Sequence, residues 1–229
     1  MPFGQIQKRV LLFIRAPELG RVKTRLGKKM DATTVLSLYQ CFVEDIVKTL
    51  TTGGYDITIY FFPPHKESAV QEWMGHTFHI QAQTGRELGA KMRNAFTNVF
   101  ATNVEQAVLI GSDFPDLDID VIHEAFFFLQ KKDVVMGPAR DGGYYLIGFR
   151  KETFDGDVFS GIDWGTEHVY RQTLQRIHDA DLNSHTLPVW QDIDTYEDLI
   201  AFYHRSHSHG LGYLKTMKFM KQLKLRELQ

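Results

Sequence analysis

The residues best suited to chemistry form two oppositely charged groups that lie far apart in the 229-residue chain. The first is a basic stretch, residues 15–29, with six Lys and Arg residues against one acid, Glu18. The second consists of aspartates in the segments GSD at 111–113 and DID at 192–194. Cationic side chains suit di- and triphosphates, and carboxylates are ligands for Mg²⁺. Together the two groups indicate chemistry on a phosphorylated substrate.

The basic stretch follows an apolar run at residues 9–15, which has the length and β-branched content of a buried strand. In an open α/β sheet, ligands collect at the carboxyl ends of the strands, where this loop must lie. The spacings of a Walker loop and of a dinucleotide-binding loop are both absent. On charge alone a solvated surface loop is the alternative, and the position after the first strand favours phosphate binding.

The acidic segments also follow strand-like runs. Asp113 ends an apolar strand at residues 107–110, so it should project from the carboxyl edge near the same crevice. Asp192 and Asp194 alternate, which places both carboxylates on one side if the segment is extended. Helix capping is an alternative for Asp116, Asp118 and Asp194, and for the last two it is the preferred or a concurrent role. Asp113 is the strongest metal candidate.

A glycine-rich turn adds a further candidate site. Gly142 and Gly143 permit close approach of the backbone to a ligand, or positive φ angles. Asp141, just before them, could bind an acceptor hydroxyl or act as a base, or it could cap the turn. Trp164 could line the acceptor side, or it could pack at the entry to a helix.

The elements that must position these residues alternate along the chain to about residue 205. The expected strands cover residues 9–15, 56–62, 77–83, 107–110, 133–136 and 144–149, and the expected helices cover 32–50, 86–101, 119–130, 166–180 and 196–204. This order predicts an α/β three-layer sandwich, a mostly parallel mixed sheet with helices on both faces. The strand at 144–149 follows its predecessor too closely for a helical crossover, so we expect it to be antiparallel or elsewhere in the sheet. We expect one domain over residues 1–205 and a basic helical tail over 206–229.

Composition limits the partners. The net charge of -2 argues against a bulk nucleic-acid binder. The single cysteine, Cys41, cannot form a disulfide within the chain and suits a reducing, cytoplasmic setting. No apolar run reaches the length of a membrane span. The basic tail could rest on a membrane surface or form a homodimer, and packing on its own domain is the favoured interpretation.

Five motifs carry a family resemblance. They are RAPELGRVKTRL at 15–26, GSD at 111–113, DGGYYLIG at 141–148, IDWGT at 162–166 and DIDTYEDL at 192–199. In this order they resemble the glycosyltransferase-A-like family called radical-SAM/selenodomain-associated transferase 1, or DUF2064, over residues 9–202. The resemblance implies a nucleotide-diphospho-sugar transferase fold related to the molybdenum-cofactor and phospholactate guanylyltransferases.

The resemblance also implies roles for individual residues. Nucleotide binding falls to Arg15, Pro17, Gly20, Lys23, Arg25, Gly85 and Gly89; metal binding to Asp113, Asp192 and Asp194; catalysis to Lys23, Asp113 and Asp141; and the acceptor side to Gly142, Gly143 and Trp164. The implied activity is a transferase that depends on Mg²⁺ or Mn²⁺ and acts on a nucleotide-activated small molecule. Glycosyl transfer from an NDP-sugar is the leading hypothesis. The alternatives are a nucleotidyltransferase that releases pyrophosphate from an NTP, and a nucleotide-binding protein without turnover.

Overall fold

The structure, a computed structural model, describes residues 6–223 of the chain. A seven-stranded sheet has the order β3-β2-β1-β4-β6-β5-β7. The strands are β1 (Lys8–Arg15), β2 (Ile57–Phe62), β3 (His79–Ala82), β4 (Gln106–Ile110), β5 (Val134–Pro138), β6 (Tyr144–Arg150) and β7 (Ser184–Thr186). Neighbouring strands are parallel except at β6, which is antiparallel to both β4 and β5. The predicted mixed, mostly parallel sheet is confirmed, and so is the antiparallel strand within it.

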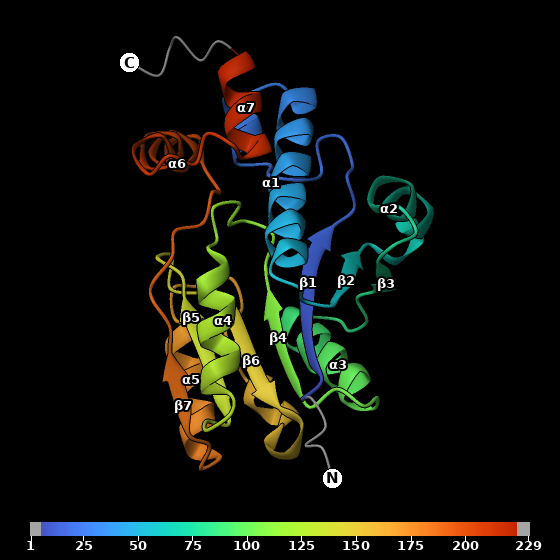
Figure 1. The fold of residues 1–229 in the computed structure, drawn as a ribbon, viewed down its shortest axis with the longest axis vertical. Helices are drawn as coiled ribbons and strands as arrows, with labels where there is room; N and C mark the ends of the chain where they lie inside the picture. Colours follow the sequence, from blue (N-terminus) through green and yellow to red (C-terminus); the bar gives the residue numbers. More distant parts are fainter. Residues whose placement is uncertain (1–5, 224–229) are drawn as a thin grey trace.

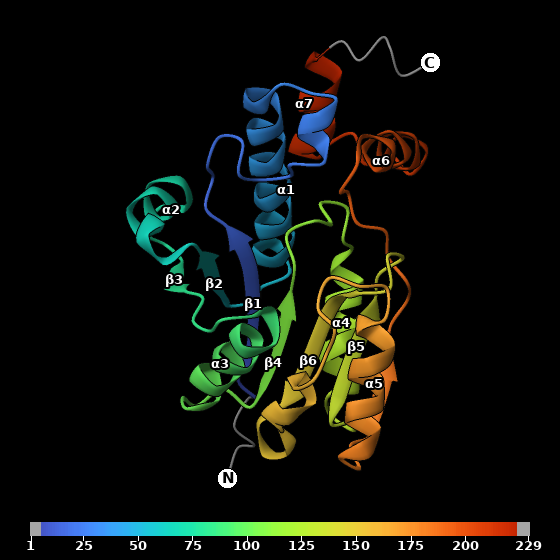
Figure 2. The same ribbon diagram turned by 180° about the vertical axis from the view of Figure 1, so that it is seen from behind.

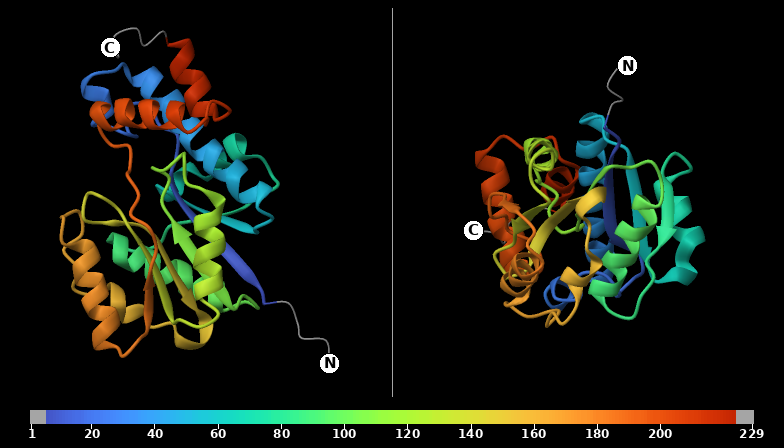
Figure 3. Two further views of the ribbon diagram at one scale, coloured as in Figure 1. Left: turned by 60° about the vertical axis from the view of Figure 1, so that its left-hand side comes forward. Right: turned by 90° about the horizontal axis from the view of Figure 1, so that it is seen from below.

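Helices cover both faces of the sheet. They are α1 (Ala32–Thr52), α2 (Glu67–Met74), α3 (Leu88–Phe100), α4 (Ile119–Phe128), α5 (Val169–Asp179), α6 (Tyr196–Ser208) and α7 (Lys215–Gln222), with short 3-10 turns η1 (Leu26–Lys28), η2 (Pro64–Lys66), η3 (Lys151–Thr153) and η4 (Gly156–Phe159). Helices α1 and α4 pack on one face (Figure 1), and α3 and α5 pack on the other (Figure 2). Seen from below, the sheet runs between the two helical layers (Figure 3). The predicted α/β three-layer arrangement is confirmed.

The central strand β1 shows why the sheet is buried on both faces. Val10, Leu12 and Ile14 join the core cluster under α1 and α4, whereas Leu11 and Phe13 join the cluster under α3. Successive side chains of a strand point to opposite faces, so a continuous apolar run is what a doubly covered strand requires. The strand ends at Arg15, so the basic loop begins at the carboxyl edge of the sheet.

Several element boundaries agree with their capping residues, and others do not. Asp31 caps α1 by accepting from the Thr34 N–H, and Asp118 caps α4 by accepting from the Asp120 N–H. Helix α5 begins at Val169 rather than at residue 166. Helix α2 and strand β7 were not expected, because they are only 8 and 3 residues long and therefore too short to show a clear hydrophobic period.

The C-terminal helices α6 and α7 lie beyond the carboxyl ends of the strands (Figure 1; Figure 3, left). They form a third apolar cluster with α1, to which Leu26, Ile193, Leu199 and Met217 contribute. Within the described residues, the tail helix α7 thus packs on its own chain. The expected boundary at residue 205 falls inside α6, and the division into a domain and a tail stays a prediction. No helix between residues 6 and 223 is long and apolar enough to cross a bilayer.

Candidate functional site

The basic loop after β1 is held by two apolar side chains. Val22 and Leu26 are almost fully buried, Val22 in the cluster under α1 and Leu26 in the third cluster with α6 and α7. Gly20 has a φ of 69°, which suits glycine and turns the chain back. Between the two anchors, Lys23 has a φ of 43°, a conformation that is uncommon for a residue with a side chain. The loop therefore has a fixed path, and Lys23 projects from its most constrained point.

Lys23 lies between two aspartates from distant parts of the chain. Its Nζ is 2.7 Å from Oδ1 of Asp113 and 2.8 Å from Oδ1 of Asp194, and its side chain is only 5% exposed. Burial by itself lowers the pKa of Lys23, but the charges and hydrogen bonds of the two aspartates outweigh burial and raise the pKa above its ordinary value. Lys23 is therefore a permanent cation here. Arg25 reaches the same group more loosely, with Nη1 3.3 Å from Oδ2 of Asp194 and a side chain that is 68% exposed.

The backbone fixes both aspartates. Asp113 follows β4 in the loop before α4, and its carbonyl oxygen accepts from the Ile193 N–H at 3.1 Å. Asp194 comes immediately before a capping box, in which Thr195 and Asp198 bond each other's backbone at the start of α6. The expectation that Asp194 itself caps this helix is wrong, because Thr195 is the N-cap and leaves the Asp194 carboxylate free for Lys23 and Arg25.

Asp116 does not cap a helix either. Its side chain is 3% exposed and forms an ion pair with Arg205, whose Nη2 lies 2.9 Å from Oδ2. It also accepts a hydrogen bond from Nε1 of Trp190 at 3.2 Å. This carboxylate therefore joins the β4–α4 loop to α6 and is not available to the basic loop.

Asp141 and Asp192 add negative charge near the pair of aspartates. Oδ1 of Asp141 accepts from the Gly143 N–H at 2.9 Å, which is the turn-capping role weighed for it, while the residue remains exposed. Burial, followed by the charges of Asp141 and Asp194, raises the pKa of the Asp192 carboxyl to about 6. The raised pKa thus reflects burial first and repulsion between the neighbouring carboxylates second.

The carboxylates around Lys23 suit a divalent cation that prefers oxygen ligands, but they do not form a complete coordination shell. Asp113 and Asp194 already share one cationic group, the Lys23 ammonium, and Asp192 lies in their field. In residues 6–223, no group of three His, Cys, Asp or Glu comes together closely enough to hold a metal ion. Mg²⁺ commonly binds one or two carboxylates and completes its shell with water and substrate phosphates. Binding of a metal ion by Asp113, Asp192 and Asp194 therefore stays a prediction.

The remaining residues predicted to bind the nucleotide lie near the ends of β1 and β2 and at the start of α3. The guanidinium of Arg15 lies over the Phe62 ring at 5.6 Å, and Nζ of Lys91 lies over the same ring at 3.6 Å. Pro17 is partly buried in the loop that carries Lys23. Gly85 and Gly89 face the protein: a Cβ at Gly85 would meet the backbone of Ala90, and a Cβ at Gly89 would meet Trp164 and the Phe159 carbonyl. These two glycines are explained by packing at the start of α3.

The acceptor-side residues lie on the turn after β5 and the loop before α5. Gly142 has a φ of 89°, and a Cβ there would collide with the backbone of Glu167. The Gly142 carbonyl accepts from the Tyr170 N–H at 2.8 Å. Trp164 packs edge-on against Tyr144, and its Nε1 is buried without a hydrogen-bond partner among the described residues. Their role toward an acceptor stays a prediction.

Two comparisons identify the family. The model of a family described as "Uncharacterized protein conserved in bacteria (DUF2064)" matches residues 46–166. A solved structure from Desulfovibrio desulfuricans G20, whose name of nucleotide-diphospho-sugar transferase is itself provisional, is 35% identical with a TM-score of 0.92, and the match covers 96% of each chain. The chain belongs to the DUF2064 family. Its N-terminal loop and its DID segment lie outside the matched residues, but the D. desulfuricans structure spans almost the whole DUF2064 chain.

More distant structures share the fold of this DUF2064 protein. CMP:2-keto-3-deoxy-manno-octonic acid synthetase complexed with CTP is 11% identical, with a TM-score of 0.55, over 89% of this chain and 99% of that one. Rv0371c from Mycobacterium tuberculosis H37Rv, in complex with manganese, is 16% identical, with a TM-score of 0.52, over 84% and 95% of the two chains. At these identities the likeness shows the fold alone. Among curated proteins no match is found.

The structure adds residues to the site of this DUF2064 protein that sequence reasoning did not select. The Tyr39 hydroxyl accepts from the Arg15 N–H, donates to the Arg15 carbonyl and lies 3.5 Å from Oγ of Ser112. It thereby joins the end of β1 to the segment that carries Asp113. In the sequence Tyr39 is one of several aromatic and aliphatic residues on the core face of a helix, and nothing distinguishes it. Lys91 had no distinguishing signal either, because its contact with Phe62 exists only in the fold.

Proposed function

We propose that this DUF2064 protein is a magnesium-dependent transferase that acts on a nucleotide-activated small molecule, with glycosyl transfer from an NDP-sugar as its reaction. The observation that carries the proposal is the position of Lys23 between Asp113 and Asp194 at the carboxyl edge of the sheet. A buried permanent cation beside carboxylates is suited to a substrate whose phosphates bind both a lysine and a metal ion. The name of the D. desulfuricans relative supports the same class of substrate.

The residues would divide the work as follows. Lys23 and Arg25 bind the diphosphate oxygens, and the exposed Arg25 can turn toward them without leaving a buried partner. Carboxylates of Asp113, Asp192 and Asp194 would hold Mg²⁺, and a bound Mg²⁺ would supply positive charge beside the departing phosphate. Asp141, on the exposed turn, accepts the proton of the acceptor hydroxyl. At the same time the oxygen of that hydroxyl bonds to the anomeric carbon of the sugar. The bond from that carbon to the phosphate oxygen breaks, and the NDP leaves with the electron pair.

Nucleotidyl transfer from an NTP is the second candidate, because cations at this loop would serve a departing pyrophosphate equally well. Fold neighbours such as the CTP-bound synthetase make it worth testing, although at 11% identity they show the fold alone. The two reactions differ in the bond that breaks: a sugar carbon–oxygen bond in one, and a phosphorus–oxygen bond between phosphates in the other.

The test is a product assay. The protein is incubated with Mg²⁺ or Mn²⁺, a panel of NDP-sugars and NTPs, and a mixture of acceptors, and released NDP and pyrophosphate are measured. NDP release that Asp113→Asn abolishes supports glycosyl transfer, and pyrophosphate release supports the second candidate. Asp120→Asn, in the exposed first turn of α4, is the matched control and should leave turnover unchanged. Nucleotide binding without either product would identify a binding protein without turnover and would refute both reactions.

A further inference from the structure

A cavity in the described part of the chain, residues 6–223, does not contain the Lys23 site. It has a volume of about 790 Å³ and lies between the C-terminal half of α1, the loop before α4, residues 189–191 and the α6–α7 connection. Cavities of roughly 300–1,000 Å³ are typical of small-molecule sites. Neither Lys23 nor Asp113, Asp192 or Asp194 lines it. The cavity is therefore a second candidate site, bordered by three of the loops that carry the first.

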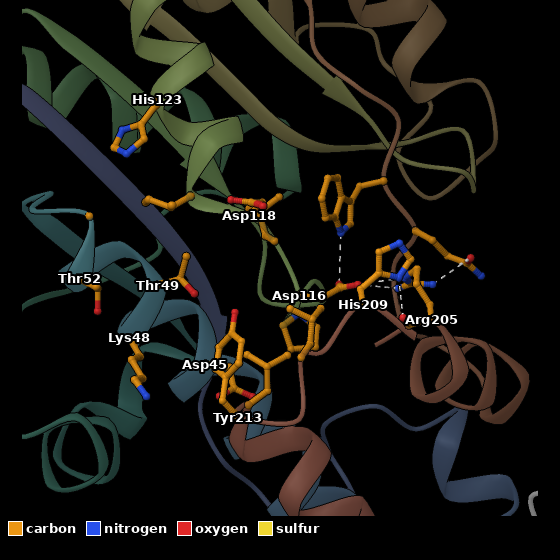
Figure 4. A pocket seen from close by; sticks show the side chains of 18 of the residues that line it. Asp45, Lys48, Thr49, Thr52, Asp116, Asp118, His123, Arg205, His209 and Tyr213 are labelled. Atoms are coloured by element: carbon orange, nitrogen blue, oxygen red, sulfur yellow. Dashed lines mark hydrogen bonds and ion pairs between the residues drawn. The ribbon is translucent and has the colours of Figure 1, made fainter. Parts of the chain in front are cut away.

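The acids of the cavity are already satisfied by the protein. Asp45 is buried and accepts from the Lys215 and Thr216 N–H groups at the start of α7. Asp116 is paired with Arg205, and Asp118 caps α4. Figure 4 shows Asp116 and Arg205 together at one end of the cavity. All three acids therefore already accept hydrogen bonds from the protein.

The bases of the cavity are not all satisfied. Arg140 is exposed and forms no ion pair with any carboxylate in the described part of the chain. His209 lies beside Arg205 (Figure 4), with its Nδ1 2.7 Å from the Arg205 carbonyl oxygen, and it too is exposed. Arg140 therefore brings to the cavity a positive charge that no ion pair within residues 6–223 offsets.

The walls of the same cavity are apolar. Val189 and Tyr213 are each 58% exposed, which is unusual for large hydrophobic side chains, and both line it. Leu117, Ile119 and Trp190 complete this surface. Apolar side chains that converge on one hollow gain stability when a ligand removes them from water. The positive charge of Arg140 and the apolar wall together favour a ligand that is an amphipathic anion.

We propose that this cavity binds a small organic acid, with its carboxylate or phosphate at Arg140 and its apolar body against Val189, Trp190 and Tyr213. The site is separate from that of the nucleotide and does not depend on the proposed transferase activity. Because Arg140 and Gln191 line the cavity and directly precede Asp141 and Asp192, a ligand there would rest on the segments that carry those carboxylates.

Binding of decanoate, decyl phosphate and decanol to the full chain, measured by calorimetry and by tryptophan fluorescence, tests the proposal. We expect one decanoate or decyl phosphate per chain and at least tenfold weaker binding of neutral decanol; whichever anion binds more tightly identifies the head group. Arg140→Gln should weaken anion binding about tenfold, and Trp190→Phe should remove the fluorescence change while calorimetric binding persists. Arg171→Gln, an exposed arginine on α5, is the matched control and should change nothing.

Three outcomes would overturn the proposal. They are equal binding of decanol and decanoate, an Arg140→Gln variant that binds like the parent, and no binding of either anion at about 1 mM. A second calorimetric titration with nucleotide on the same samples keeps this result independent of the Lys23 site.

Discussion

Lys23 occupies the place between two carboxylates where a metal ion could bind, and replacing it should have two opposite effects. In Lys23→Met the side-chain volume is kept and the ammonium is lost, so Asp113 and Asp194 face each other without a shared cation. We therefore expect Mn²⁺ alone to bind the variant about tenfold more tightly than the parent, a change of about 1.4 kcal/mol. Affinity for a nucleoside diphosphate should fall by a similar factor, because a phosphate ligand is lost.

The effect on stability follows from exposure. Removing one partner of a fully buried ion pair costs about 3–5 kcal/mol. Lys23 is 5% exposed, but Asp113 and Asp194 are 38% and 34% exposed, so water can screen much of their repulsion. We expect a loss of about 1–2 kcal/mol, which for a chain of this size lowers Tm by about 2–8 °C. Added Mn²⁺ should recover most of that loss.

The assay combines thermal unfolding with a Mn²⁺ titration followed by electron paramagnetic resonance of the free ion. Lys29→Met serves as the control, because Lys29 is a loop lysine that pairs with Glu197 on the surface and lies outside the Lys23 group. Its Mn²⁺ affinity should equal that of the parent. If Lys23→Met instead weakened Mn²⁺ binding, or left Tm unchanged, the view that the lysine and the metal share these carboxylates would be refuted.

Three further predictions concern stability. Gly142→Ala should cost more than about 2 kcal/mol in chemical denaturation, because its Cβ collides with Glu167, whereas Gly20→Ala, with a similar φ and nothing within 4 Å, should cost about 1 kcal/mol. Burial alone would raise the pKa of Asp133, but hydrogen bonds from Asn183 and the charge of Arg150 lower it below 3.8. The stability that this carboxylate contributes is present above pH 3.8 and is lost as the pH falls through the lower folded pKa. Asp133→Asn should therefore be destabilising at pH 7 and nearly neutral only once the pH lies below that folded pKa. Asp45→Ala removes the carboxylate that accepts from the first N–H groups of α7, and it should cost about 1–2 kcal/mol and speed amide exchange in that helix, which mass spectrometry would detect.

The layered fold could be predicted because each of its signals is local. The apolar run at 9–15, the caps Asp31 and Asp118, and the short link before the antiparallel strand all depend on neighbours in sequence. Strand β7 could not be predicted, since its sequence Ser-His-Thr becomes a strand only when β5 offers a paired edge.

The candidate site, like the fold, has features that the sequence could predict and features that it could not. The basic loop and the GSD and DID segments could be found from residue type and from their places after strands, and the structure brings Lys23, Arg25, Asp113 and Asp194 together. What the sequence could not show is pairing over long distances. Asp116 pairs with Arg205, which lies 89 residues further along the chain. This ion pair removes Asp116 from the set of candidate ligands. Likewise, only the packing of Trp164 and of the Phe159 carbonyl in the fold explains why residue 89 must be glycine.

The third apolar cluster affects the position of the charged residues around Lys23. Leu26 follows the lysine of the basic loop by three residues, Ile193 directly precedes Asp194, and both are packed in that cluster with α6 and α7. This cluster therefore helps to position both Lys23 and Asp194, and the hydrogen bond from the Ile193 N–H to the Asp113 carbonyl joins Asp113 to the same segment. A change in the packing of this cluster would therefore shift the lysine and both carboxylates together.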